Sequence, residues 1–299
     1  MKKYTYNSDV FTNEDDVSYY LLGAFMTDGC VVMRNGSPVR ADIGSVDLEW
    51  IDKIKNVICP QMNTSKIIND CGSEFHRIGI FSKEICQWLI AKGCTPQKSL
   101  TLKFPQVAKQ YMPDFIRGCI DGDGCITEFS RQQEYNGKFY TCHKHACYLC
   151  SASEDLILGY QTFLDANKIG YSKIARAPAD IPPSINGRQI ISTATQHRIT
   201  VASNKDINTL LTMVYYSGHK ISMARKRDAA LKIISNTGKY LAIHKTPSNT
   251  RKKLCERDVI EIRQLLPPHN ISQIARDYGV SWNTIDRVFT NQSWKHVKT

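Results

Sequence analysis

Alternating apolar and polar positions near the start of the chain predict a β-hairpin with one buried and one open face. Two alternating runs, 31–34 and 39–43, flank Asn35-Gly36, which is a strong signal for a two-residue turn. The face directed at a core would carry Val31, Met33, Val39, Ala41 and Ile43. The opposite face would carry Arg34, Arg40 and Asp42. Since side chains alternate between faces along a strand, the pattern predicts a sheet with one open, Arg-bearing face.

Two apolar segments of helical character resemble each other at a distance of 95 residues. The first reads Tyr20-Leu-Leu-Gly-Ala-Phe-Met-Thr-Asp28-Gly29, and the second reads Phe115-Ile-Arg-Gly-Cys-Ile-Asp-Gly-Asp123-Gly124. Both carry Gly at the fourth position and end in Asp-Gly. We expect Gly29 and Gly124 to take the left-handed conformation that commonly ends a helix.

An Asp on the last turn of a helix lies at the negative end of the helix dipole, which costs about 0.3–1 kcal/mol at an exposed position. Asp28 and Asp123 occupy this unfavourable place in both segments. The repetition indicates that negative charge is required there. Two carboxylates that share a cation are typical of a metal site that cuts phosphodiesters.

The elements that follow each segment come in the same order, so the chain contains a duplicated unit. After the first hairpin, the sequence predicts a helix over 47–58, a hairpin over 64–81 and a helix over 82–91. The second copy has a hairpin over 125–151, a helix over 153–167, and strands over 171–177 and 196–202. Asp47 and Ser153 are the candidate N-caps of corresponding helices.

The second copy is longer than the first, and its two insertions fall at hairpin loops, one of which contains Pro182-Pro183 and Asn186-Gly187. The predicted fold class is therefore α+β, with two related αββαββα repeats over 1–105 and 106–235.

Charge is distributed unevenly along the chain. Of the net +11, residues 219–299 hold 16 Lys and Arg against 6 Asp and Glu. A basic tail on a nearly neutral body indicates a nucleic acid or another anionic partner. We find no signal peptide and no membrane-length apolar run, and we interpret the 11 cysteines as reduced thiols. We therefore expect a cytoplasmic protein, from a bacterium or a phage-infected cell, or an organellar one, that is not secreted.

The tail is predicted to be a basic linker over 236–253 followed by a small all-α domain over 254–299. Within this domain, an amphipathic helix is expected over 256–266. Ala275 and the turn residue Gly279 then precede a second apolar pattern, an arrangement that resembles a helix-turn-helix. The second helix of this module would present to DNA Trp282, Asn283, Asp286 and Arg287.

The two Asp-Gly segments resemble the LAGLIDADG motifs of the homing endonuclease family. The copy that ends at Gly124 is a close match, whereas the first has Met26 and Thr27 where Asp121 and Gly122 stand in the second. Both keep the acid before the final Gly, and the resemblance covers about residues 17–235. It implies that the two motif helices pack side by side, with Gly23 and Gly118 allowing close approach, under a saddle of two sheets over DNA.

The resemblance also implies the roles of individual residues. Asp28 and Asp123, with the carbonyls of Thr27 and Gly122, are expected to bind magnesium or manganese, and Lys98 and Lys220 to assist at the metal waters. The expected DNA-binding residues are Arg34, Arg40, Lys66, Arg77, Lys173, Arg198, Trp282, Asn283 and Arg287. The implied enzyme is a monomeric, site-specific endonuclease that cuts both strands of double-stranded DNA and mobilises an intron or a free-standing gene.

Two alternatives remain open at this point. One is a transcription regulator derived from the family, although loss of the metal acids would be expected in such a protein and both are present. The other is a maturase that binds intron RNA, which can keep the same acids. A zinc site at Cys142-His-Lys-His-Ala-Cys147-Tyr-Leu-Cys150 is not favoured, because alternation along a strand would separate the ligands.

Overall fold

The computed structural model describes residues 4–68, 72–135, 138–178, 184–185, 188–189, 194–243, 254–265 and 271–297. They form two compact units, Met1–Tyr240 and Leu241–Thr299. The predicted loop residues Pro182, Pro183, Asn186 and Gly187 lie outside the described residues. No helix in the described part of the chain is both long and apolar enough to cross a membrane.

The first repeat forms a four-stranded antiparallel sheet in the order β1-β2-β4-β3 with helices on one side. Its elements are α1 (Asp9–Thr12), α2 (Asp16–Thr27), β1 (Gly29–Arg34), β2 (Ser37–Ser45), α3 (Leu48–Ile58), β3 (Ser65–Ile68), β4 (Glu74–Ile80) and α4 (Lys83–Ala91). The predicted turn is confirmed, since Asn35 and Gly36 join β1 to β2 with positive φ angles of 49° and 72°.

The second repeat has a sheet of the same connectivity, β5-β6-β10-β7. Two short 3-10 helices, η1 (Lys98–Leu100) and η2 (Lys109–Tyr111), lead into it. Its main elements are α5 (Met112–Asp123), β5 (Gly124–Tyr135), β6 (Lys138–Ser151), α6 (Glu154–Ala166), β7 (Ser172–Arg176), β10 (Gln196–Val201), α7 (Asn204–Val214) and α8 (Ala224–Ile243). A separate small ladder pairs β8 (Ser184–Ile185) with β9 (Arg188–Gln189). The predicted fold class is confirmed.

The helices begin where the local sequence supplies a capping side chain. Asp15 accepts hydrogen bonds from the amides of Val17 and Ser18 at the start of α2, at 3.0 and 2.9 Å. Ser153 caps α6 as expected. Asp47 stands at the predicted N-cap of α3, but its carboxylate makes no capping bond and instead pairs with Arg225.

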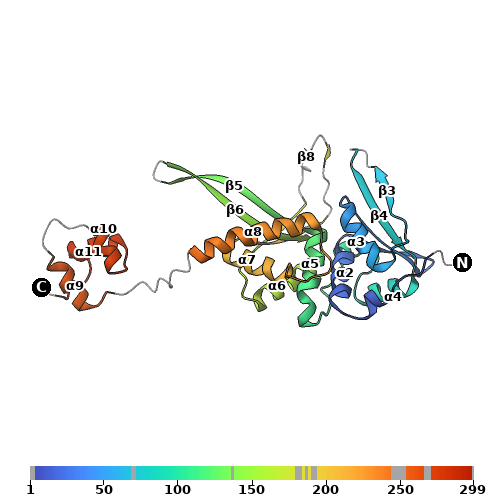
Figure 1. Cartoon of the computed structure of the whole chain (residues 1–299), viewed down its shortest axis with the longest axis horizontal. Coiled ribbons are helices and arrows are strands. Elements are labelled where there is room, and N and C mark those ends of the chain that lie inside the picture. The colour runs from blue at the N-terminus through green and yellow to red at the C-terminus, as the bar shows by residue number, and fades with distance from the viewer. Residues whose placement is uncertain are drawn as a thin grey trace. The chain divides into compact units, whose positions relative to one another are not determined.

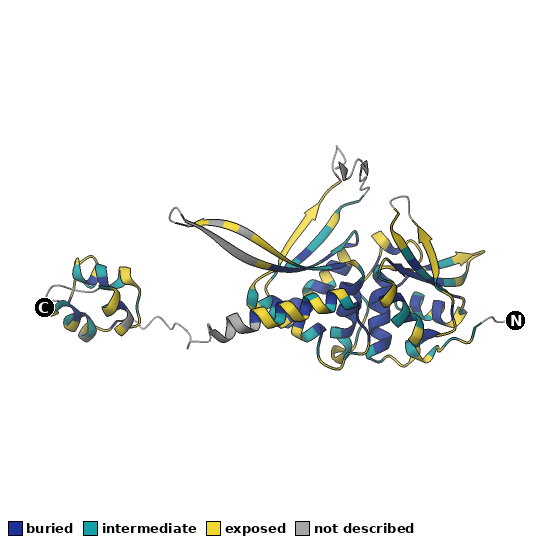
Figure 2. Ribbon diagram, turned by 45° about the horizontal axis from the view of Figure 1, so that its top comes forward, coloured by how far each residue is buried: buried dark blue, intermediate teal, exposed yellow. Residues whose placement is uncertain are grey.

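Both sheets of the first unit lie on the same side of its helices (Figure 1). The face of each sheet toward the helices is apolar, and α2 and α5 are buried along most of their length (Figure 2). One continuous core, built on Trp50, Ile54, Leu156 and Leu211 among others, runs through both repeats. No helix of the described residues covers the other face of either sheet, which we call the open face (Figure 1).

Two local expectations were wrong. Gly124 has extended backbone angles, φ −82° and ψ 165°, and Gly29 has no positive φ, because each helix passes directly into a strand. The glycines are needed for space, since a Cβ on Gly29 would lie 2.6 Å from the Phe25 ring. In the hairpin, the register shifts after Val32, so Met33 and Val39 are each 38% exposed instead of joining the core.

The described residues of the second unit form a three-helix module with its own small core. Its helices are α9 (Glu256–Arg263), α10 (Ile271–Asp277) and α11 (Trp282–Phe289). Gly279, with φ +64°, makes the turn between α10 and α11. The core side chains are Leu254, Val259, Ile262, Ala275, Ile285, Val288 and Val297.

The predicted linker over 236–253 begins too early, because α8 continues to Ile243. Residues 244–253 lie outside the described residues. Ala230 and Ile233 are buried in the core of the first unit and anchor α8 there. The helix continues beyond these residues into the segment that was predicted to be a linker.

Candidate active site

The motif helices α2 and α5 cross at their glycines. A Cβ on Gly23 would lie 2.2 Å from the carbonyl oxygen of Phe115, and one on Gly118 would lie 2.2 Å from that of Tyr20. Backbone atoms cannot move aside as a flexible side chain can, so only glycine permits this approach. The two helices therefore run together to their C-terminal ends.

At those ends the two motifs meet. Gly122 lies against Thr27, because a Cβ on Gly122 would fall 2.0 Å from Thr27 Oγ1 and 3.5 Å from the amide nitrogen of Asp28. Asp28 is the C-cap residue of α2, and Asp123 is the last residue of α5. The two acids predicted from the repeat are thus brought to one place, where both present surface to solvent.

The two carboxyl groups interact electrostatically. Burial within the crowded recess and, second, the negative charge of Asp123 raise the pKa of Asp28 to about 6. Burial also raises the pKa of Asp123, against the lowering effect of Lys98 and Lys226. A cation placed between the carboxylates would remove the repulsion that the bare pair experiences.

A buried lysine contacts the end of each motif helix. Lys98 Nζ donates to the carbonyl oxygen of Gly29 at 2.5 Å and lies 3.5 Å from that of Thr27. Thr27 is the last residue of α2, and helix C-terminal carbonyls lack intrahelical partners and attract cations, whereas Gly29 is the first residue of β1. Lys98, predicted from the sequence, is 7% exposed and lies at the site.

In the second repeat this place belongs to Lys226, which the sequence interpretation missed. Lys226 Nζ donates to the carbonyls of Ile120, Asp121 and Gly122 at 2.8, 2.6 and 2.8 Å. Burial lowers the pKa of Lys226, whereas the nearby Asp121 and Asp28 raise it.

The prediction of Lys220 is wrong for this position. Its side chain is 61% exposed and pairs with Asp16 at 2.8 Å, at the opposite end of α2 from Asp28. The sequence alignment of the repeats selected Lys220, which lies in the loop between α7 and α8. The lysine that reaches the site, Lys226, lies on α8 itself. The run Arg225-Lys226-Arg227 was the only sequence signal available.

Asp121 holds the start of α8 in place. Its fully buried carboxylate accepts hydrogen bonds from Tyr20 and Tyr215 hydroxyls, each at 2.7 Å, and from the Met223 amide at 2.8 Å. The last contact satisfies a free amide just before the first turn of α8, as an N-cap would, and Lys226 lies on that turn. The first motif has Met26 at the matching position, so this support exists in one repeat only.

A cavity of about 280 Å³ opens beside Asp123 between the two repeats. Thr27 and Lys98 of the first repeat and Asp123, Ser151 and Gln196 of the second line it. Lys98 therefore lies next to the Thr27 carbonyl of the first motif and to Asp123 of the second. Both Asp28 and Asp123 have Lys98 and Lys226 as cationic neighbours, one from each repeat.

These residues fit a hard divalent cation better than a soft one. Two carboxylates supply oxygen ligands of the kind that Mg²⁺ binds while keeping several waters. The carbonyl oxygens of Thr27 and Gly122, which the resemblance suggested as further ligands, each have a lysine at hydrogen-bond distance. Among the described residues, no group of three or more His, Cys, Asp and Glu side chains could hold a metal, and the side chains of Cys142 and His143 are not described.

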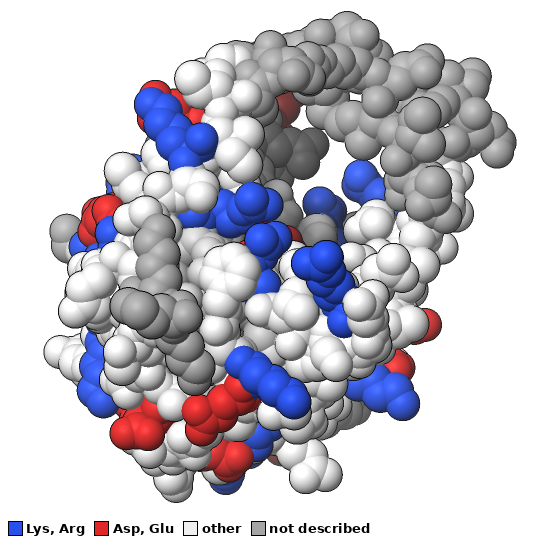
Figure 3. Space-filling view, turned by 90° about the vertical axis from the view of Figure 1, so that its right-hand side faces the viewer, with Lys and Arg blue, Asp and Glu red and all other residues white. Residues whose placement is uncertain are grey.

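Several predicted DNA contacts lie on the open sheet faces. Arg40 and Arg77 share the open face of the first sheet, opposite Ala41 and Ile78, and Arg198 has the same place in the second. Arg34 is exposed at the tip of the first hairpin. Figure 3, which views the right-hand end of Figure 1, shows Lys and Arg side chains gathered beside a hollow and most of the visible Asp and Glu side chains lower on that face.

Lys66 and Lys173 do not lie on the open face. Lys66 pairs in register with His76, and Lys173 with the core residue Ile199, so both side chains are on the helix side of their edge strands. Glu74 pairs with Lys66 at 2.5 Å, and Glu154 at the start of α6 lies 3.5 Å from Lys173. The register of an edge strand, which the sequence does not reveal, decided these positions.

The three predicted contacts in the second unit are exposed on α11: Trp282, Asn283 and Arg287. Ser281 caps this helix by accepting a hydrogen bond from the Thr284 amide at 3.3 Å. Ile285 and Val288 face the module's core, which leaves the other side of α11 available to a partner.

Comparison with known proteins supports the fold. No family model matches the chain, and no curated protein matches it. The meganuclease I-SmaMI bound to uncleavable DNA has a TM-score of 0.50 at 11% identity, covering 78% of this chain and 94% of that one. The LAGLIDADG meganuclease I-AabMI bound to uncleaved DNA has a TM-score of 0.47 at 12% identity, covering 84% and 98%.

The LAGLIDADG homing endonuclease I-LtrWI bound to target DNA has a TM-score of 0.46 at 12% identity, covering 79% of this chain and 93% of that one. At such identities a likeness concerns the fold alone. This chain has the two-repeat LAGLIDADG meganuclease fold.

Proposed function

We propose that this chain is a homing endonuclease of the LAGLIDADG family, which cuts both strands of a long, specific DNA target and mobilises an intron or a free-standing gene. One chain holds both repeats and both acids, so a monomer suffices. The observation that carries the proposal is the meeting of Asp28 and Asp123 at the adjoining ends of α2 and α5, next to two buried lysines.

The acids would hold magnesium or manganese. Bound there, the metal would supply an activated water and positive charge against the negative charge that develops at the scissile phosphate. The chain's own contribution is to hold both carboxylates in fixed positions. They stand at the ends of two helices whose backbones pack closely at Gly23 and Gly118.

Lys98 and Lys226 would hold positive charge next to the acids. Each ammonium is anchored by carbonyl oxygens at a helix end, so little reorganisation is required when negative charge develops on the phosphate. In this proposal Lys226 takes the role that the sequence suggested for Lys220.

The open sheet faces and the basic second unit would bind the duplex. Arg40, Arg77 and Arg198 stand on the uncovered faces, and α11 presents Trp282, Asn283 and Arg287. A two-stranded β-ribbon and an α-helix both fit the major groove of B-DNA. Several phosphate contacts would make binding strongly dependent on salt.

The test is cleavage of a plasmid that carries the DNA flanking the chain's own gene, with and without Mg²⁺. We expect linear product with the metal and none with chelator. Asp28→Asn and Asp123→Asn should each abolish double-strand cleavage while DNA affinity stays within a few-fold, and Asp155→Asn, an exposed acid on α6, should cut normally.

Tight binding without any metal-dependent cleavage would contradict the proposal and favour the regulator. Retention of intron splicing by Asp28→Asn, with cleavage lost, would add a maturase role.

A further inference from the structure

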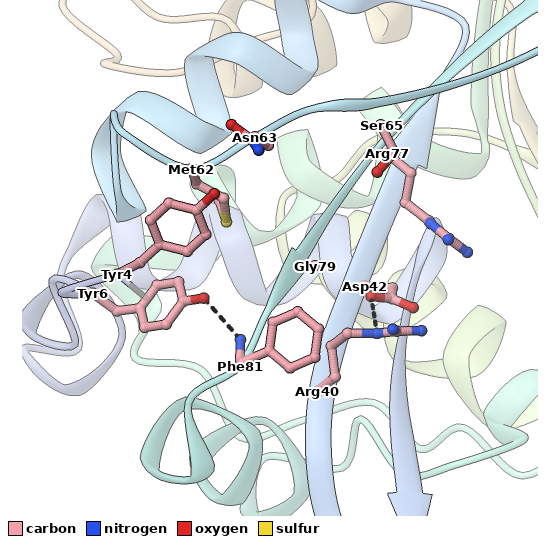
Figure 4. A pocket seen from close by; sticks show the side chains of 10 residues that line it. All are labelled: Tyr4, Tyr6, Arg40, Asp42, Met62, Asn63, Ser65, Arg77, Gly79 and Phe81. Carbon is pink, nitrogen blue, oxygen red and sulfur yellow. Dashed lines mark hydrogen bonds and ion pairs between the residues drawn. The ribbon is translucent and has the colours of Figure 1, made fainter. Parts of the chain in front are cut away.

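The open face of the first sheet holds a cavity of about 510 Å³ next to the N-terminal segment. Tyr4 and Tyr6 close one end, and Tyr6 accepts a hydrogen bond from the Phe81 amide at 3.1 Å (Figure 4). Arg40 and Asp42 of β2 lie along its other side. None of the acids and lysines of the candidate active site lines this cavity.

Arg40 is held by two neighbours of different chemistry. Its Nε lies 2.7 Å from Asp42 Oδ1, and its guanidinium carbon is 5.4 Å from the centre of the Phe81 ring. The Asp42 side chain is 8% exposed and that of Arg40 is 31% exposed. The Nε end of the guanidinium is thus held next to Asp42, while part of the side chain stays exposed. Figure 4 shows the Arg40 and Asp42 side chains facing each other.

Gly79 makes room for this pair. It faces Asp42 in the β2–β4 ladder, and a Cβ there would lie 3.0 Å from Arg40 Cδ and 3.0 Å from Asp42 Oδ1. A side chain at position 79 would therefore press against both members of the pair.

The second repeat lacks the arrangement. Gly29 pairs with Ile43 and Gly124 pairs with Leu149, so Ala146 corresponds to Arg40 and Tyr148 to Asp42. There the guanidinium carbon of Arg198, from the neighbouring strand, lies 5.2 Å from the centre of the Tyr148 ring. The two open faces therefore present different chemistry to a ligand.

We propose that Arg40 is a specificity-determining residue that reads one guanine in the half of the target bound by the first repeat, with Asp42, Phe81 and Gly79 positioning it. The inference rests on the proposed function, since it assumes that this face lies on duplex DNA. Arg40 Nε lies in an ion pair with Asp42 but makes no hydrogen bond, and the two Nη groups have no hydrogen-bond or ion-pair partner among the described residues. A planar guanidinium matches the O6 and N7 acceptors of guanine in the major groove.

The experiment is cleavage and binding of a library in which every position of the target is randomised singly. Arg40→Ala and Arg40→Lys should both reduce the preference for guanine at one position, by about tenfold or more, and leave the other positions unchanged. Lys keeps the charge but cannot bond two acceptors in a plane, so Arg40→Lys should retain most of the affinity.

Two further variants separate positioning from direct reading. Asp42→Asn should relax the same position partially, because the guanidinium loses its fixed orientation. Arg198→Ala is the matched control, and any change it causes should fall in the other half of the target.

An unchanged profile in both Arg40 variants, or an affinity loss spread evenly over all sequences, would overturn the inference and identify a phosphate contact. In that case the wild-type chain still cuts its target and the proposed function stands. Absence of any duplex binding by the wild-type chain would overturn the proposed function together with the inference.

Discussion

Two acids and two lysines decide what chemistry the ends of α2 and α5 can perform. Asp28 and Asp123 follow directly from the duplicated segments, and Lys98 lies where the resemblance suggested. Lys226 could not be found this way, because its place depends on the path of the loop between α7 and α8 and on the buried carboxylate of Asp121. The local sequence predicts where the two motif helices end. It does not predict that the loop before α8 brings Lys226 back to the end of α5.

The lysine assignment gives a direct comparison. Lys226→Met should reduce the cleavage rate by about 10²–10³-fold, the usual effect of removing one group that stabilises transition-state charge. Lys220→Met should cut within a few-fold of the wild type, because its ammonium is exposed and pairs only with Asp16. Single-turnover rates at saturating enzyme measure both. Equal losses in the two variants would contradict the placement of Lys226.

The acid pair also predicts a cost to stability when no metal is bound. The pKa of Asp28 is raised to about 6 in the folded state. Above that pH the ionised carboxylate costs more free energy in the folded state than in the unfolded chain, so it destabilises the fold. Asp28→Asn should therefore be more stable than the wild type at pH 7.5 with chelator, by about 1 kcal/mol once solvent screening is allowed for.

The difference should shrink as the pH falls through 6 toward 4, where the folded carboxyl becomes neutral. Added Mg²⁺ should stabilise the wild type and not the variant. Thermal unfolding across this pH range is the measurement, and a difference that grows on acidification would contradict the shared carboxylate site.

The pairing of α2 with α5 is the element on which the geometry of the site depends. The crossing glycines, the cap at Ser153 and the hairpin turn at Asn35-Gly36 were predictable, because each reflects a local steric or hydrogen-bonding requirement, whereas the expected cap at Asp47 was wrong. The faces of Met33, Lys66 and Lys173 were not, since a register shift and the pairing of edge strands are settled by the whole sheet.

The helix crossing can be tested by adding one carbon atom. Gly118→Ala would place a Cβ 2.2 Å from the carbonyl oxygen of Tyr20, so the helices must separate. We expect a loss of about 3 kcal/mol or more in the free energy of unfolding, since the clash is with backbone in a packed core. Cys119→Ala, at the next buried position of the same helix, should lose about 1 kcal/mol. Chemical denaturation of both variants measures the difference.

The described chain consists of a two-repeat unit and a second unit with three described helices. Each has its own core, and the cores share no residue among those described. The charge excess lies at the C-terminal side of the chain, which includes α8, the residues over 244–253 and the second unit. The uneven charge distribution was the sequence feature that predicted two units. The predicted start of the linker at residue 236 was too early, because α8 extends to Ile243.

Removal of residues 244–299 should leave a folded catalytic unit with weaker DNA binding. A protein that neutralises fewer phosphates releases fewer counterions, so the dependence of log Kd on log salt should become shallower by about 0.9 for each phosphate that the second unit had neutralised. Cleavage should persist at high enzyme concentration. Binding titrations at several salt concentrations test this, and an unaltered slope would show that the second unit does not touch the duplex.

The hairpin of the second repeat pairs twelve residues of β5 with β6, whereas that of the first pairs six of β1 with β2. At about 3.3 Å per strand residue, the longer arm extends roughly 20 Å farther from its sheet. Laid along a double helix, this amounts to about six extra base pairs on one flank. Nucleotides protected from hydroxyl radicals should accordingly be distributed lopsidedly around the cut, and an inverted copy of one flank could not substitute for the other.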